Sequence, residues 1–129
     1  MPKILIVEDH AVFRQSLKEI LQAQFPGIVV EEAAEGNEAL KKTDDLHPDL
    51  IFMDIKLPGE NGLELTKKIK NRYPKIPIVI LTSYDLPEYR QIAFQYGANY
   101  FVPKCSSIRE EILKLVKSIL LDRGTTQKR

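Results

Sequence analysis

Short apolar runs alternate with stretches of helical periodicity along most of the chain. Runs rich in β-branched residues predict five buried strands, at 4–7, 28–30 with Ala33, 50–53, 78–81 and 100–102. Apolar residues spaced three or four positions apart predict helices over 12–21, 38–46, 63–72, 87–96 and 108–121. Because strand and helix alternate throughout, we expect one α/β domain in which helices cover both faces of a parallel sheet.

Local signals sharpen some of these boundaries. Asn37 fits the N-cap of the second helix, and Pro87 fits the first turn of the fourth. Gly97 fits the cap at the end of that fourth helix. Residues 122–129 carry no apolar side chain. We therefore expect the ordered domain to end at Leu121 and to be followed by a flexible tail or the start of a linker.

Composition and charge exclude several classes of protein. The 129 residues carry a net charge of +1, so no global field attracts nucleic acid or an anionic membrane. The single cysteine, Cys105, excludes an internal disulfide and a cysteine-based zinc site. Apolar stretches are far shorter than a membrane span, and the first strand begins at once, without a signal peptide. We expect a cytoplasmic protein with no membrane partner.

Chemically active side chains follow four of the five predicted strands. Glu8-Asp9 comes after the first strand, Asp54 after the third, Thr82 after the fourth and Lys104 after the fifth. The carboxyl ends of parallel strands meet at one edge of a sheet, and ligands bind there. Three acids and one base at such an edge suit a divalent cation and a phosphoryl group. The oxygen ligands favour Mg²⁺, and no cluster of histidines or thiols predicts zinc or copper.

The order and spacing of these residues resemble the receiver domain of two-component response regulators. The residues that carry the resemblance are Glu8-Asp9, Asp54, Pro58-Gly59, Gly62, Thr82-Ser83, Gly97-Ala98 and Lys104. The opening segment 4–14 is most similar to the NarL-type branch, which usually carries a C-terminal helix-turn-helix domain that binds DNA. The resemblance implies a receiver domain over 1–121 with a (βα)5 flavodoxin-like fold, also called CheY-like. Its sheet has the strand order 2-1-3-4-5.

The resemblance also implies a role for each residue at the strand ends. Asp54 is the expected phosphoacceptor, which takes a phosphoryl group from a phosphohistidine on a sensor histidine kinase. Mg²⁺ is the expected cofactor, held by Glu8, Asp9, Asp54 and the backbone carbonyl of Lys56. Thr82 and Lys104 are expected to bind oxygens of the phosphoryl group. Such a domain is not an enzyme with an external substrate, because it catalyses only its own Mg²⁺-dependent phosphorylation and dephosphorylation.

In this family phosphorylation acts as a switch, which implies further roles. Inward movement of Thr82 leaves a void that an aromatic residue fills, here Phe101, although Phe101 also fits a simple core position. The remodelled face is 86–121, which contains the fourth helix, the fifth strand and the fifth helix. This face is expected to form a homodimer and to control transcription through a DNA-binding domain outside this chain. Lys56 and Tyr84 occupy the positions that tune hydrolysis, and we expect them to shield the phosphoryl group.

Other interpretations of the same residues stay open. A flavin or nucleotide binder with this fold needs glycines and hydroxyls after the first strand, where this chain has Glu8-Asp9-His10. An aspartate-based phosphohydrolase typically has a second aspartate two residues after its nucleophile, where this chain has Lys56. A pseudo-receiver keeps the fold only as a binding module. The receiver itself is either free-standing or part of a longer regulator.

Overall fold

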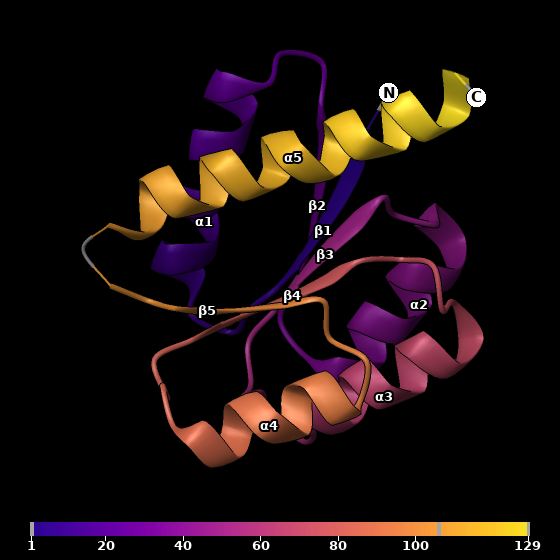
Figure 1. Ribbon diagram of the computed structural model, residues 1–129. Helices are drawn as coiled ribbons and strands as arrows, with labels where there is room; N and C mark the ends of the chain where they lie inside the picture. Colours follow the sequence, from indigo (N-terminus) through magenta and orange to yellow (C-terminus); the bar gives the residue numbers. More distant parts are fainter. Residues whose placement is uncertain (1, 106, 129) are drawn as a thin grey trace.

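A five-stranded parallel sheet forms the centre of the computed structural model, which describes residues 2–105 and 107–128 (Figure 1). The strands are β1 (Lys3–Val7), β2 (Val29–Ala33), β3 (Leu50–Met53), β4 (Ile78–Thr82) and β5 (Tyr100–Pro103). The helices are α1 (Ala11–Gln24), α2 (Gly36–Leu46), α3 (Gly62–Arg72), α4 (Pro87–Gln95) and α5 (Ile108–Lys128). The strand order is β2-β1-β3-β4-β5, which confirms the predicted flavodoxin-like, CheY-like fold.

Helices cover both faces of this sheet (Figure 1). α1 and α5 lie on one face, and α2, α3 and α4 lie on the other. Side chains alternate along each strand, so Ile4 and Ile6 pack with α1 and α5 whereas Leu5 and Val7 pack in the opposite layer. β3 and β4 are buried at every position. A strand covered on both faces has little room for polar side chains except at its end, where the candidate site begins.

The N-terminus of α2 differs from the sequence prediction. Asn37 is not the N-cap, because the helix begins at Gly36 and Glu35 occupies the cap position. Glu38 accounts for the difference, since its Oε1 accepts a hydrogen bond from the amide of Ala34 at 2.8 Å. This bond ties the first turn back to the residues before the helix, much as the acid of a capping box does.

The ends of α4 agree with the sequence prediction. Pro87 is the first residue of the helix, where its missing amide costs nothing. Gly97 follows the helix with a φ of 104°, a conformation that residues with a side chain rarely adopt. Lys70 of α3 packs over it, so that an added Cβ would lie 3.1 Å from the Cγ of Lys70. Both signals therefore mark real helix boundaries.

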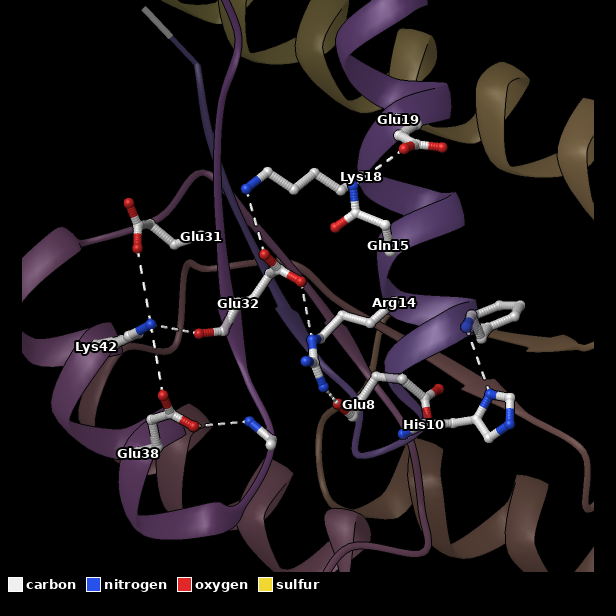
Figure 2. Close-up of polar contacts among 12 residues, drawn as sticks. Glu8, His10, Arg14, Gln15, Lys18, Glu19, Glu31, Glu32, Glu38 and Lys42 are labelled. Atoms are coloured by element: carbon white, nitrogen blue, oxygen red, sulfur yellow. Dashed lines mark hydrogen bonds and ion pairs between the residues drawn. The ribbon is translucent and has the colours of Figure 1, made fainter.

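β2 forms the edge of the sheet beside β1. It is continuous from Val29 to Ala33, so Glu31 and Glu32 belong to the strand although they interrupt its apolar pattern. An edge strand tolerates such residues, and Glu31 is exposed. Lys42 of α2 donates a hydrogen bond to the carbonyl oxygen of Glu32 (Figure 2). The lysine thereby satisfies a backbone group of the edge strand.

The fifth helix continues beyond its predicted end. α5 runs to Lys128, whereas Leu121 was the predicted end of the domain and 122–129 the predicted tail. The segment contains no proline, so its backbone can remain helical after the last apolar side chain. The division of the chain at Leu121 stays a prediction. Within the described residues, no helix combines the length and the apolar character needed to cross a membrane.

Candidate functional site

Backbone pairing holds the acids at the ends of β1 and β3 side by side. Val7 of β1 lies opposite Met53 of β3. The amide of Asp54 then donates a hydrogen bond to the carbonyl of Val7 at 3.0 Å, and the amide of Glu8 donates to the carbonyl of Ala33 at 2.9 Å. Glu8 and Asp54 therefore extend two neighbouring strands by one residue. The two strand ends meet at one edge of the sheet, as the sequence predicted.

Three carboxylates come together in one pocket at this edge. Oxygen atoms of Glu8, Asp9 and Asp54 all lie within 4.8 Å of one another. Glu8 and Asp54 are buried, whereas Asp9 is exposed. The pocket has a volume of about 440 Å³ and is lined by Glu8, Asp9, His10, Phe13, Asp54, Lys56, Ser83, Tyr84 and Lys104. Predicted site residues therefore form most of its wall, and His10, Phe13 and Ser83 are additional.

Lys104 enters the pocket from the end of β5. Its Nζ lies 2.6 Å from Oε1 of Glu8 and 3.6 Å from Oδ2 of Asp54, so one ammonium group contacts two acids. The other carboxylate oxygen of Glu8 accepts a hydrogen bond from the amide of His10 at 3.0 Å. The ammonium group also lies 4.3 Å from the ring centroid of Phe13 on α1, a cation–π contact. Glu8 and Phe13 thus hold the lysine within reach of Asp54.

The environment of Asp54 opposes its ionisation. Burial, followed by the negative charge of Glu8, raises the pKa of Asp54 from 3.8 to about 6. The positive charge of Lys104 and the amide of Ile55 offset part of this increase. That amide donates to Oδ1 of Asp54 at 2.8 Å. The pocket therefore holds more negative charge than its own lysine balances, a condition that favours binding of a cation.

The donor atoms of the pocket fit Mg²⁺. Within the described residues, Glu8, Asp9 and Asp54 form the one group of three ligating side chains close enough to share a metal ion. All three supply carboxylate oxygens, the ligands that Mg²⁺ prefers, and the exposed position of Asp9 leaves space for the water molecules that this ion retains. The positive charge of such an ion would counter both causes of the raised pKa of Asp54, namely burial and the negative charge of Glu8.

The predicted switch residues are both buried. Thr82 lies at the end of β4, and its hydroxyl accepts a hydrogen bond from the amide of Tyr84 at 2.9 Å. The neighbouring Ser83, and not Thr82, lines the acidic pocket. Phe101 is 6% exposed, and the guanidinium of Arg90 lies 4.9 Å from its ring centroid. In this conformation the Thr82 hydroxyl bonds the backbone, and its role as a switch stays a prediction.

Lys56 lies at the rim of the pocket between two aromatic rings. Its Nζ is 5.2 Å from the ring centroid of Tyr84 and 5.8 Å from that of Tyr89. The two rings meet edge to face at 6.3 Å. The sequence identified Lys56 and Tyr84, but it gave no reason to place Tyr89 beside them, because Tyr89 comes from the first turn of α4. The backbone of Lys56 pairs with that of Asn61 across the loop before α3.

Gly62 allows α3 to begin directly against the backbone of Asp54. An added Cβ at Gly62 would lie 1.8 Å from the carbonyl oxygen of Asp54. The amide of Gly62 donates to the carbonyl of Ile55 at 2.7 Å, and Oδ1 of Asn61 caps the helix through the amide of Leu63, also at 2.7 Å. Gly62 is one of the residues that carry the resemblance to receiver domains, and this close approach is the steric reason for a glycine at that position.

A further group of charges supports the loop after β1 (Figure 2). Arg14 of α1 donates through Nη1 to the carbonyl oxygen of Glu8 at 2.7 Å and through Nε to Oε1 of Glu32 at 2.9 Å. Lys18 lies one turn further along α1, with its Nζ 3.2 Å from Oε2 of Glu32. Sequence reasoning did not identify Arg14. The signal available was its place in segment 4–14, and its contacts depend on how α1 packs against β2.

Comparison with known proteins identifies the family. Residues 4–117 match the family described as response regulator receiver domain. The chain is 39% identical over 118 residues to the oxygen regulatory protein NreC of Staphylococcus haemolyticus, covering 91% of this chain and 54% of that protein. It is 36% identical over 107 residues to the transcriptional regulatory protein YdfI of Bacillus subtilis, covering 83% and 50%. The chain thus spans about half the length of the curated relatives it matches.

Solved structures agree with this assignment. A LuxR-family two-component response regulator from Aurantimonas superposes with a TM-score of 0.84 at 31% identity, over 93% of this chain and 85% of that one. The response regulator TrrA of Thermotoga maritima, solved in complex with Mg²⁺-BeF, superposes with a TM-score of 0.82 at 34% identity, over 92% and 99%. Fold, acidic pocket and sequence similarity agree, and the chain belongs to the response regulator receiver domain family, with LuxR-family (NarL-type) regulators among its relatives.

Proposed function

We propose that this chain is the phosphoacceptor of a two-component phosphorelay, in which Asp54 takes a phosphoryl group from a phosphohistidine on a sensor histidine kinase. The observation that carries the proposal is the buried Asp54 carboxylate, placed between two further acids and the ammonium group of Lys104. A carboxylate is a competent covalent acceptor of phosphate when neighbouring positive charge neutralises the group in transfer. We place this relay in the cytoplasm.

Each residue of the pocket has a separate role in phosphoryl transfer. An oxygen of the ionised Asp54 attacks phosphorus while the phosphorus–nitrogen bond breaks, and the imidazole keeps the electron pair of that bond. Glu8, Asp9, Asp54 and the backbone carbonyl of Lys56 would hold Mg²⁺, and the bound ion would supply positive charge against the phosphoryl oxygens. Lys104 is already 3.6 Å from Asp54 and pairs with another of these oxygens.

Thr82 and Phe101 then transmit the phosphorylation of Asp54 to the surface formed by α4, β5 and α5. The Thr82 hydroxyl accepts from the amide of Tyr84, so its own hydrogen remains available for a charged phosphoryl oxygen, and the side chain must turn toward the pocket to donate it. Phe101 packs into the space that Thr82 vacates and thereby biases the face formed by α4, β5 and α5. In our proposal this face forms a homodimer after phosphorylation and controls transcription, through a DNA-binding domain outside this sequence.

Phosphorylation by a small donor tests the proposal. We expect acetyl phosphate and Mg²⁺ to add the mass of one phosphoryl group to the intact protein, and we expect no addition to the Asp54→Asn variant. Omission of Mg²⁺ should abolish labelling as well, because the pocket then lacks the charge that stabilises the group in transfer. Mass spectrometry of the intact chain gives the result directly. Labelling of Asp54→Asn to the wild-type extent would reject Asp54 as the acceptor.

The same experiment separates the alternative functions. A pseudo-receiver stays unlabelled with Mg²⁺ present, and a phosphohydrolase releases inorganic phosphate continuously without accumulating phosphoprotein. A flavin binder shows flavin absorbance in the purified protein. Sustained labelling of one site, without rapid phosphate release, agrees only with a receiver.

Tyr84 is expected to prolong the life of the phosphoryl group. Its ring holds the ammonium group of Lys56 at the rim of the pocket, where the two side chains obstruct the approach of water. Loss of one such cation–π contact in Tyr84→Ala should speed hydrolysis by about two- to fivefold. The measurement is the decay of phosphoprotein after removal of the donor. Tyr96→Leu is the control, because it removes a similar contact with Lys67 outside the pocket, and an equal decay rate for wild type and Tyr84→Ala rejects shielding.

A further inference from the structure

Arg14 connects the loop after β1 to the edge strand of the sheet. Its Nη1 donates to the carbonyl oxygen of Glu8 at 2.7 Å, while its Nε donates to Oε1 of Glu32 at 2.9 Å (Figure 2). The Arg14 side chain is only 20% exposed. Burial disfavours the charge of Glu32, but its bonds with Arg14 and Lys18 prevail and hold the pKa of Glu32 below its ordinary value. The guanidinium therefore has an ionised anchor on one side and the loop on the other.

The loop carbonyl that Arg14 holds belongs to the peptide between Glu8 and Asp9. The Glu8 side chain is fixed independently, because Lys104 and the amide of His10 bond its two carboxylate oxygens. The Asp9 side chain is exposed, and no hydrogen bond or ion pair to it is found among the described residues. The position of the Asp9 carboxylate therefore depends on the orientation of its backbone. The amides of Glu8 and His10 hold this backbone on either side of Asp9, and Arg14 holds the carbonyl of the Glu8–Asp9 peptide.

We propose that Arg14 is a positioning residue for the Mg²⁺ site, which acts by orienting the Glu8–Asp9 peptide so that the Asp9 carboxylate faces Glu8 and Asp54. This inference rests on the proposed function, since it assumes that these acids bind Mg²⁺. Residues that orient metal ligands without touching the metal commonly affect its affinity as strongly as some ligands do.

Charge alone predicts the opposite effect, which makes the inference testable. A guanidinium near a cation site repels the cation, so its removal would tighten Mg²⁺ binding if electrostatics dominated. If positioning dominates, its removal weakens binding. Arg14→Lys separates the two effects further, because one ammonium group keeps the charge but lacks the planar fork that bonds Glu8 and Glu32 together.

The experiment is a calorimetric titration of the purified protein with Mg²⁺. We expect Arg14→Ala and Arg14→Lys to bind Mg²⁺ about tenfold more weakly than wild type. Lys18→Ala is the matched control, since Lys18 contacts the same Glu32 carboxylate but not the loop, and it should bind like wild type. Phosphorylation by acetyl phosphate provides a second readout. Arg14→Lys should require more Mg²⁺ for half-maximal rate but reach the wild-type rate at saturating Mg²⁺.

The possible outcomes distinguish failure of the positioning role of Arg14 from failure of the proposed phosphoacceptor function. Wild-type or tighter Mg²⁺ binding by the Arg14 variants would overturn the positioning role while the proposed function stands. Absence of Mg²⁺ binding by the wild type would overturn both. Urea unfolding in metal-free buffer shows whether the variants are folded. If both Arg14 variants are unfolded there, Arg14 supports the whole domain and the specific role at the metal site is rejected.

Discussion

Replacement of Asp54 by asparagine is expected to stabilise the metal-free protein at pH 7, even though it abolishes phosphorylation. Burial and the charge of Glu8 raise the pKa of Asp54 to about 6, so the ionised carboxylate costs folding free energy. A shift of this size corresponds to about 3 kcal/mol, which access of water to the open pocket reduces to about 1–2 kcal/mol. Asparagine keeps the shape and the bond with the amide of Ile55 without the charge.

The stabilisation should depend on pH in a defined direction. In the unfolded chain Asp54 loses its proton near its ordinary pKa of 3.8, whereas in the folded protein it keeps the proton up to about pH 6. Folding therefore binds a proton between these values, and the wild type loses stability relative to Asp54→Asn as the pH rises through this window. Below about pH 4 the carboxyl is protonated in both states, and the difference between the two proteins should vanish.

Urea unfolding at several pH values in the presence of a chelator measures this difference. Asp44→Asn is a control of opposite sign, because hydrogen bonds from the Tyr73 hydroxyl and from Arg72 lower the pKa of Asp44. That variant should be less stable than wild type at neutral pH, with the loss fading in acid. Addition of Mg²⁺ should stabilise the wild type more than Asp54→Asn. An Asp54→Asn variant that unfolds more easily than wild type at pH 7 would contradict the claim that the ionised Asp54 carboxylate destabilises the folded protein.

Replacement of Gly62 by alanine is expected to damage both stability and the site. The new Cβ would lie 1.8 Å from the carbonyl oxygen and 2.8 Å from the carbonyl carbon of Asp54, and neither backbone atom can move without shifting the end of β3. Overpacking of this kind costs about 2–3 kcal/mol. Because the displaced atoms belong to the phosphoacceptor itself, labelling by acetyl phosphate should fall in the part of the sample that remains folded.

Gly36→Ala is the matched control for this prediction. Gly36 is also buried at the start of a helix, but an added Cβ there would lie 3.2 Å from the Cβ of Glu60, a tight contact that a shift of a few tenths of an ångström in the loop before α3 relieves. We expect a change of less than about 1 kcal/mol and unchanged labelling. Urea midpoints and intact masses of both variants give the comparison. A Gly62→Ala protein with wild-type stability and labelling would show that the approach of α3 to Asp54 is looser than the structure indicates.

The sequence predicted that the acids and the lysine meet at one edge of the sheet, because the positions of strand ends follow from the topology. Once the apolar runs indicate parallel strands, Glu8, Asp54 and Lys104 must meet, whatever rotamers they adopt. The direction in which each side chain points does not follow from the strand topology. The hydroxyl of Thr82 bonds the amide of Tyr84, a choice that depends on the local turn after β4. The start of α2 was misplaced because the helix begins at Gly36, with Glu35 at the cap position, and Glu38 bonds back to the amide of Ala34.

The sequence did not identify residues whose contacts join one helix to another element. Arg14 and Phe13 lie on α1 and serve the pocket only because that helix packs beside β2 and the end of β5. Tyr89 joins Lys56 only through the approach of α4 to the loop after β3. Helical periodicity assigns such residues to a face of their own helix but says nothing of the neighbour that the face meets. Those contacts require the tertiary arrangement.

The contact of Lys42 with the carbonyl of Glu32 restricts how copies of this protein can associate. An open edge strand is a template to which a further strand can add, and it is a common origin of aggregation. Here a positive charge from α2 already bonds the margin of the sheet at β2. Extension of the sheet into a continuous intermolecular ribbon at that margin would displace the lysine, so the addition of a strand from a second copy is disfavoured at β2.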